Sequence, residues 1–166
     1  MILKGCSYKF GDDVNTDYII SGRYKFSITD MKELAKHILE DLEPDFYSKL
    51  KPGHSFLVAG RNFGMGSSRE QAPLVIKEAG IVGVVAKSFA RIFYRNAVNI
   101  GLPLIEADTD GIEPEDELEI ELENGILRNK TKNTEIKIRP LPPFMCKLLG
   151  DGGLVEHFKK HKGFDL

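Results

Sequence analysis

Residues 60–70, with the sequence GRNFGMGSSRE, combine residue types that could bind an anion. The glycines can adopt positive φ and let the backbone come close to a ligand. Ser67, Ser68 and Arg69 follow them directly before an expected helix, where free N–H groups and the helix dipole favour negative charge. The guanidinium of Arg69 adds a two-pronged donor that matches a carboxylate or a phosphate. The stretch therefore predicts an anion-binding turn.

A simpler structural role fits the same residues. Ser67 and Glu70 have the Ser-x-x-Glu spacing of a capping box, in which each side chain accepts a backbone N–H at a helix start. Pro73 opposes a helix that begins at Ser68, because proline inside a helix costs about 3 kcal/mol. We therefore expect the regular helix to begin near Gln71 and the serines to stay in the turn, with capping as the alternative.

A second polar cluster, formed by Asn15, Thr16 and Asp17, precedes the apolar residues 18–20. Small polar residues in front of an apolar run are typical of a helix cap, but they can also contribute to a binding site. Both interpretations of Asp17 stay open at this point.

The elements that must position these residues alternate between strands and helices. Apolar runs at 55–59 and 81–86, each bounded by glycine, predict buried parallel strands with a helix between them. A helix over 88–99 leads to a further short strand at 104–105. The periodicity also predicts a strand over 2–10 and a helix over 31–42, which is capped by Asp30 and ends before Pro44.

The later part of the chain has a different pattern. Residues 117–122 and 135–138 alternate between apolar and polar, and Asn124-Gly125 is a hairpin turn signal. Two short helices, over 142–149 and 152–161, are expected to follow. The fold class is therefore α/β: a three-layer β/β/α arrangement, with a parallel core sheet and a small antiparallel sheet.

Composition limits the possible functions. The 166 residues, 42% of them hydrophobic, are enough for one core, so we expect a single domain over 1–166. A membrane span and a secretion signal are not expected, which predicts a cytoplasmic protein. The formal net charge of −2 predicts no nucleic-acid partner. Cys6 and Cys146 lie too far apart in sequence to indicate a metal site, and no motif includes the histidines, which are His37, His54, His157 and His161.

Three motifs carry a family resemblance. Residues 13–20 (DVNTDYII), 60–70 and 86–96 (AKSFARIFYRN) resemble, in order and spacing, the swivel domain of the aconitase superfamily. Within it, nearly the whole chain is similar to the small subunits of 3-isopropylmalate dehydratase, also called isopropylmalate isomerase. These are hydro-lyase subunits that move a hydroxyl group between adjacent carbons of a malate-type acid in leucine biosynthesis.

The resemblance implies roles for individual residues. Ser67 matches the serine base that takes a carbon-bound proton, and Arg69 matches the arginine that grips a substrate carboxylate. Ser68 would be a supporting donor, and Asp17 would help to organise the site. The resemblance also implies that no cofactor is bound by this chain, and that a [4Fe-4S] cluster on a large subunit completes the active site. Arg91, Arg95 and Asn96 are expected to serve as scaffold or subunit contacts.

The substrate depends on a loop after the second polar cluster. In the family, a Tyr-x-x-Ser/Thr stretch contacts the variable arm of the acid, and it matches residues 24–27 (YKFS) here. Phe26 stands where homoaconitase-type subunits have an arginine, and it offers only apolar surface, which favours isopropylmalate. Lys25 could still serve a distal carboxylate if it turned inward. Dimethylmalate dehydratase, homoaconitase and a non-catalytic carboxylate-binding module are the alternatives.

Overall fold

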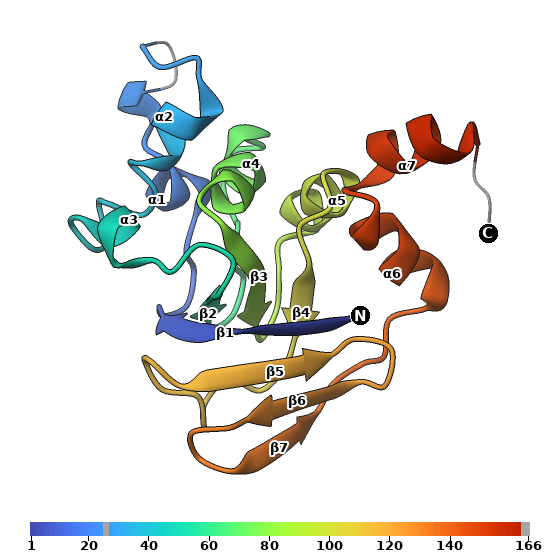
Figure 1. Cartoon of the computed structure of the whole chain (residues 1–166). Helices are drawn as coiled ribbons and strands as arrows, with labels where there is room; N and C mark the ends of the chain where they lie inside the picture. The colour runs from blue at the N-terminus through green and yellow to red at the C-terminus, as the bar shows by residue number, and fades with distance from the viewer. Residues whose placement is uncertain (25–26, 164–166) are drawn as a thin grey trace.

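The computed structural model describes residues 1–24 and 27–163. Its strands form one seven-stranded sheet in the order β4-β3-β2-β1-β5-β6-β7 (Figure 1). The parallel part contains β1 (Ile2–Lys9), β2 (Ser55–Ala59), β3 (Ile81–Ala86) and β4 (Leu104–Glu106). The antiparallel part contains β5 (Glu117–Glu121), β6 (Ile126–Asn129) and β7 (Thr134–Lys137). The predicted parallel and antiparallel segments are both present.

The prediction of a separate antiparallel sheet was wrong, because β1 joins the two parts. Its residues pair with β2 in parallel and with β5 in antiparallel, for example Cys6 opposite Ser55 and Leu3 opposite Ile120. The sheet curls, so that Ile120 of β5 packs in the same core as Phe56 and Val58 of β2. An alternating pattern shows that a strand has one buried face, but it does not show which other strand lies at its edge.

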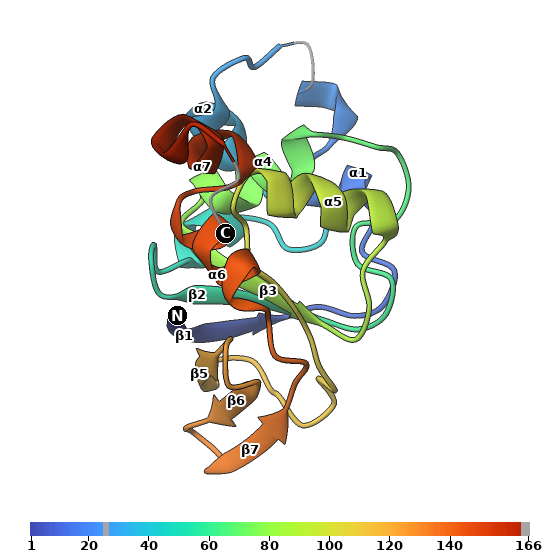
Figure 2. The ribbon, with the colours of Figure 1, turned by 90° about the vertical axis from the view of Figure 1, so that its right-hand side faces the viewer.

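The helices within residues 16–99 cover the opposite face of the parallel strands (Figures 1 and 2), whereas the helix Pro143–Gly150 packs in the core that contains β5. Leu57 and Ala59 of β2 point into this second core, together with Val75 and Ile76 of a central helix. The helical elements are α1 (Thr16–Ile19), a 3-10 turn (Gly22–Tyr24), α2 (Met31–Ala35), α3 (Phe46–Lys49), α4 (Gln71–Glu78), α5 (Arg91–Asn99), α6 (Pro143–Gly150) and α7 (Leu154–His161). Within the described ranges, no helix has both the length and the apolar composition that a bilayer span requires.

The first predicted helix is much shorter than expected. Helix α2 begins after Asp30 as predicted but ends at Ala35, and turns follow it. Leu39 has a positive φ of 51°, and its N–H donates to the carbonyl of Ile19 at 2.9 Å. Most apolar side chains of the predicted helix over 31–42 are still buried. The sequence therefore predicted which side chains enter the core, but not the backbone conformation after Ala35. The hydrogen bond from Leu39 to the distant Ile19 outweighs the local helix propensity of residues 36–42.

Candidate active site

The Gly-rich turn at 60–70 leaves the carboxyl end of β2 and runs beside α1 and α5. Two of its glycines are required by the geometry. Gly64 has φ 84°, and a Cβ there would lie 2.2 Å from the ring of Phe93 in α5. Gly66 has φ 95°. Positive φ and close packing both favour glycine, so the turn can pass tightly over the start of α5.

Backbone hydrogen bonds attach this turn to the second polar cluster. The Gly64 N–H donates to the carbonyl of Val14 at 2.7 Å, and the Thr16 N–H donates to the carbonyl of Met65 at 2.9 Å. The hydroxyl of Thr16, a buried residue, donates to the carbonyl of Ser67 at 2.8 Å. Thr16 therefore fixes the backbone on both sides of Gly66 and orients the serine that follows.

The third motif is attached to the same turn. The Phe63 N–H donates to the carbonyl of Ser88 at 3.0 Å, and the Ala90 N–H donates to the carbonyl of Phe63 at 2.9 Å. The Ser88 hydroxyl oxygen accepts from the Asn62 N–H at 2.8 Å. The three motifs that carry the family resemblance therefore meet at one place, although the first residue of the first motif and the last residue of the third are 83 positions apart in sequence.

The capping-box alternative is not what the turn adopts. Helix α4 begins at Gln71, as predicted, and Glu70 precedes it; among the described residues this helix start has no side-chain capping hydrogen bond. Pro73 lies in the first turn of α4, where its missing N–H removes no helical bond. Ser67 and Ser68 are both exposed. Their hydroxyl groups are therefore accessible to a ligand.

Arg69 is held in place by the segment around α1. Its guanidinium forms an ion pair with Asp17, and its Nη1 donates to the carbonyl of Ile20 at 3.3 Å. The side chain of Arg69 is only 18% exposed, whereas that of Asp17 is 58% exposed. Asn15 rather than Asp17 caps α1, since its Oδ1 accepts from the Tyr18 N–H at 3.0 Å. Asp17 is therefore free of the capping role and positions Arg69.

A hollow of about 220 Å³ lies between the turn and α5. It is lined by Thr16, Gly64, Gly66, Ser67, Ser68, Arg69, Ala90, Arg91, Ile92, Phe93 and Asn96. Arg91 and Asn96 thus join the candidate site, a placement that sequence analysis did not favour over scaffold or subunit contact. A larger hollow of about 610 Å³ lies on the β4 side of α5 and is lined by neither Ser67 nor Arg69. The smaller hollow is lined by Ser67, Ser68 and Arg69, whereas the charged groups of the larger one are Arg91, Arg95, Glu106 and Arg139.

The comparisons with known proteins agree with this geometry. The model of the aconitase C-terminal domain matches residues 26–109. Small subunit 2 of 3-isopropylmalate dehydratase from Archaeoglobus fulgidus is 56% identical over 161 residues, which cover 97% of each chain. The chain belongs to this family. It is a member of the 3-isopropylmalate dehydratase small subunits, which are hydro-lyase subunits with the aconitase C-terminal, or swivel, domain.

Two further relatives refine the comparison. The crystal structure of 3-isopropylmalate dehydratase from Methanocaldococcus jannaschii superimposes with a TM-score of 0.91 at 49% identity, covering 98% of this chain and 96% of that one. The methanogen homoaconitase small subunit of Methanothermobacter thermautotrophicus is 50% identical over 159 residues, covering 96% of this chain and 92% of that one. The family therefore includes relatives named for two different activities at similar identity.

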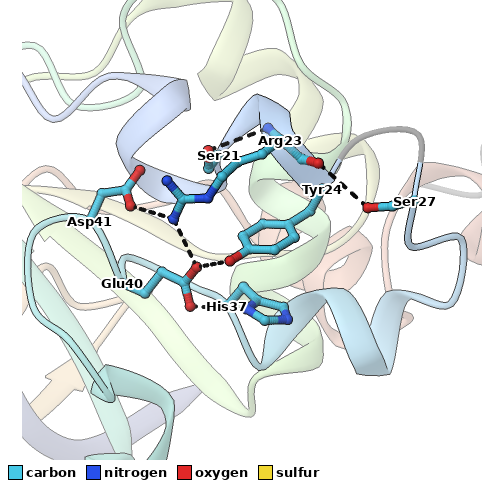
Figure 3. Close-up of polar contacts among 7 residues, drawn as sticks. All are labelled: Ser21, Arg23, Tyr24, Ser27, His37, Glu40 and Asp41. Carbon is cyan, nitrogen blue, oxygen red and sulfur yellow. Dashed lines mark hydrogen bonds and ion pairs between the residues drawn. The ribbon is translucent and has the colours of Figure 1, made fainter.

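The predicted specificity stretch, residues 24–27, lies only partly within the described residues. Phe26, the predicted contact to the variable arm, and Lys25 both lie outside the described residues. Tyr24 is described: its hydroxyl donates to Glu40, and its ring stacks on His37 at a centroid distance of 4.0 Å (Figure 3). Sequence analysis did not identify these partners, because neither belongs to a motif.

The two cysteines of this chain are not suited to be ligands of an iron–sulfur cluster. Cys6 in β1 and Cys146 in α6 are buried, and neither lines the hollow beside Ser67. Burial raises the pKa of both thiols, whereas cluster ligands are thiolates. A [4Fe-4S] cluster needs about three or four cysteine ligands at one place. The residues of this chain do not provide them.

Proposed function

We propose that this chain is the small subunit of a 3-isopropylmalate dehydratase, which interconverts 2-isopropylmalate and 3-isopropylmalate in leucine biosynthesis. Dehydration removes a hydroxyl group from one carbon and a proton from its neighbour, and rehydration returns both in the opposite arrangement. The observation that carries the proposal is the meeting of the three family motifs at one hollow, with Ser67 and Arg69 in its wall. A cytoplasmic location remains part of the expectation from sequence.

In this proposal Ser67 is the catalytic base, and its oxygen accepts the carbon-bound proton. A serine hydroxyl is a weak base at neutral pH unless its ionised form is stabilised. Arg69 and Arg91 line the same hollow, and their positive charges favour an alkoxide there. Ser68, exposed beside Ser67, is placed to act as a supporting hydrogen-bond donor.

Arg69 is proposed to bind a substrate carboxylate. Its ion pair with the exposed Asp17 and its bond to the Ile20 carbonyl orient the guanidinium before substrate arrives. A pre-oriented fork loses less rotational freedom when a carboxylate binds. Asp17 would therefore act on the substrate through Arg69, as a positioning residue.

The active site is proposed to be completed by a large subunit, which the relatives' designation as small subunits supports. Beside the hollow, Ile92 is 52% exposed and Tyr18 is 42% exposed. Exposed apolar and aromatic side chains next to a half-formed site suit a protein interface. A [4Fe-4S] cluster on that partner would supply the Lewis acid that takes the leaving hydroxyl.

The choice of substrate rests on Phe26. An apolar side chain favours the isopropyl group of isopropylmalate over the distal carboxylate of homoaconitase-type substrates. Overall identity does not decide this, because the homoaconitase relative is 50% identical and the first dehydratase relative 56% identical. Dimethylmalate, a close analogue, is the second candidate. If Phe26 sets the preference, then Phe26→Arg should shift turnover toward homocitrate-type acids; an unchanged preference would contradict that role.

The test is reconstitution with the cluster-loaded large subunit from the same cell under anaerobic conditions. Formation of the conjugated unsaturated acid is followed by ultraviolet absorbance with isopropylmalate, dimethylmalate and homocitrate in turn. Turnover of isopropylmalate that needs both chains is the expected result. If the enzyme prefers another acid, that acid becomes the proposed substrate in place of isopropylmalate. If the chain binds the acids but forms no complex with the large subunit, a non-catalytic carboxylate-binding module is favoured.

A further inference from the structure

A compact Asp-His-His cluster lies where α6 is followed by α7, two helices labelled in Figure 2, and none of its residues lines the hollow beside Ser67. His157 Nδ1 lies 2.7 Å from Asp151 Oδ2, and His161 Nε2 lies 3.0 Å from the same oxygen. Both histidines lie on α7, four residues apart, so their rings share one face of the helix. The three ligand atoms all lie within 4.8 Å of one another.

The turn between the helices brings Asp151 back onto α7. Gly152 and Gly153 have φ of 94° and 109°, values that side chains rarely allow. A Cβ on Gly153 would lie 2.3 Å from the carbonyl oxygen of Asn99, so this position also requires glycine for packing. The backbone is therefore constrained to place the carboxylate opposite the two imidazoles.

The cluster is more buried than a surface ion pair. His157 is fully buried, and the side chains of Asp151 and His161 are 8% and 20% exposed. Within the described part of the chain, the buried Nε2 of His157 has no hydrogen-bond partner. The Nδ1 of His157 faces Asp151, so the unpartnered Nε2 is the ring nitrogen that lies outside the cluster.

We propose that Asp151, His157 and His161 form a binding site for a borderline divalent transition-metal ion of the Zn²⁺ type. Two imidazole nitrogens and one carboxylate oxygen are the ligands that such ions prefer. Bonds of about 2.0–2.1 Å to one tetrahedral ion place ligand atoms about 3.3 Å apart. The contacts of 2.7 and 3.0 Å to Asp151 would therefore open by about 0.6 and 0.3 Å, and the two imidazole nitrogens, which lie within 4.8 Å of each other, would adjust to the same spacing. The fourth position is left for water on the more exposed His161 side.

Metal binding requires a different proton arrangement. Without metal, each imidazole can donate its facing N–H to Asp151 Oδ2. With metal, both rings stay neutral and carry their proton on the other nitrogen, Nε2 of His157 and Nδ1 of His161. The Nε2–H of His157 then has no acceptor among the described residues, which lowers the affinity of the site. Lys160 pairs with Asp151 through the opposite oxygen, Oδ1, at 2.9 Å, so Oδ2 remains available. Its positive charge nevertheless lowers the affinity of the site for a cation.

The experiment is titration of the full-length, chelator-treated chain with ZnCl₂ by calorimetry, together with the visible absorbance of Co²⁺ as a spectroscopic probe. The expected result is one ion per chain, a tetrahedral Co²⁺ spectrum and a Zn²⁺-dependent rise in melting temperature. His161→Gln should weaken binding by at least about tenfold, because an amide can keep a hydrogen bond to Asp151 but is a poor ligand for Zn²⁺.

Two further variants complete the test. His54→Ala removes a histidine that pairs with Glu117 far from the cluster, and it should leave Zn²⁺ binding unchanged. Lys160→Met removes the competing ammonium and should tighten binding. Absence of saturable binding by the wild-type chain, or equal binding by wild type and His161→Gln, would overturn the proposal and leave the cluster as a hydrogen-bonded link between the helices.

Discussion

The turn at 60–70, which contains Arg69, and the segment of described residues 21–24 and 27–41, which begins beside the Arg69 guanidinium, are held by different forces. Buried backbone hydrogen bonds to neighbouring motifs hold the turn. In the segment, Glu40 accepts from Tyr24, Arg23 and His37, and Asp41 also pairs with Arg23 (Figure 3). Backbone bonds fix atoms at one geometry, whereas partly exposed charges are weaker and respond to salt and pH. The proposed base Ser67 thus lies on the rigid element, whereas Tyr24, a described residue of the predicted specificity stretch, lies on the segment held by side-chain charges, the adjustable segment.

The largest effect is expected at the rigid element. Ser67→Ala should lower kcat of the reconstituted enzyme by about 10²–10⁴-fold, the usual contribution of a general base. Assembly with the large subunit should be unaffected, because Thr16 bonds to the backbone of residue 67 and not to its hydroxyl. Single-turnover kinetics and size-exclusion chromatography measure the two properties. Ser68→Ala, the matched neighbour, should lose much less activity, and equal losses would contradict the assignment of Ser67 as the base.

Arg69, the residue of the turn whose guanidinium lies beside Gly22 of the segment, should show a binding defect when it is substituted. Arg69→Lys keeps the positive charge but loses the fork, so KM should rise by about 10–100-fold with a smaller change in kcat. Steady-state kinetics over a wide substrate range would separate the two constants. A pure kcat defect with unchanged KM would place Arg69 in the proton transfer and not in substrate binding.

The rigidity of the turn can be tested directly. Gly64→Ala places a methyl group against Phe93 at a positive φ, and it should lower the free energy of unfolding by about 1–3 kcal/mol. Gly111→Ala is the matched control, since nothing lies within 4 Å of its built Cβ. Denaturant unfolding of both variants gives the comparison. Equal stabilities would mean that the turn can shift away from α5 at little cost.

The smallest effect is expected in the adjustable segment, and it should depend on pH. Burial raises the pKa of Glu40, but hydrogen bonds from Tyr24, His37 and Arg23 outweigh it, so the pKa lies below its ordinary value. A lowered folded-state pKa contributes stability above the unfolded value of about 4.3, and this contribution is lost as pH falls through the folded value. Glu40→Gln should therefore be slightly less stable than wild type at pH 7, and the difference should vanish in acid.

Thermal unfolding of the wild type and Glu40→Gln between neutral and acidic pH measures this loss. A stability difference that is constant across the pH range would show that the Glu40 charge contributes nothing. Selectivity among the three acids can be measured on the same variant. A change there, with stability nearly intact, would link the segment to substrate choice.

Much of the candidate site could be predicted from sequence because local chemistry determines it. Pro73 excludes a helix start at Ser68, which correctly placed the start of α4 near Gln71. Glycine at 64 and 66 correctly indicated a turn with positive φ. Arg91 and Asn96 were undervalued, because a helix pattern does not show which polar face meets a distant turn.

The sequence by itself determined every strand except β6, most helices, the turn at 60–70 and the family. Only the tertiary structure decided that β1 joins both parts of the sheet, that α2 ends at Ala35, and that Asp151 meets His157 and His161. The physical reason is the range of the interactions. Propensity, capping and turn chemistry act over a few residues. Strand order, the Leu39–Ile19 hydrogen bond and the Asp-His-His cluster instead depend on tertiary contacts between separate segments of the chain.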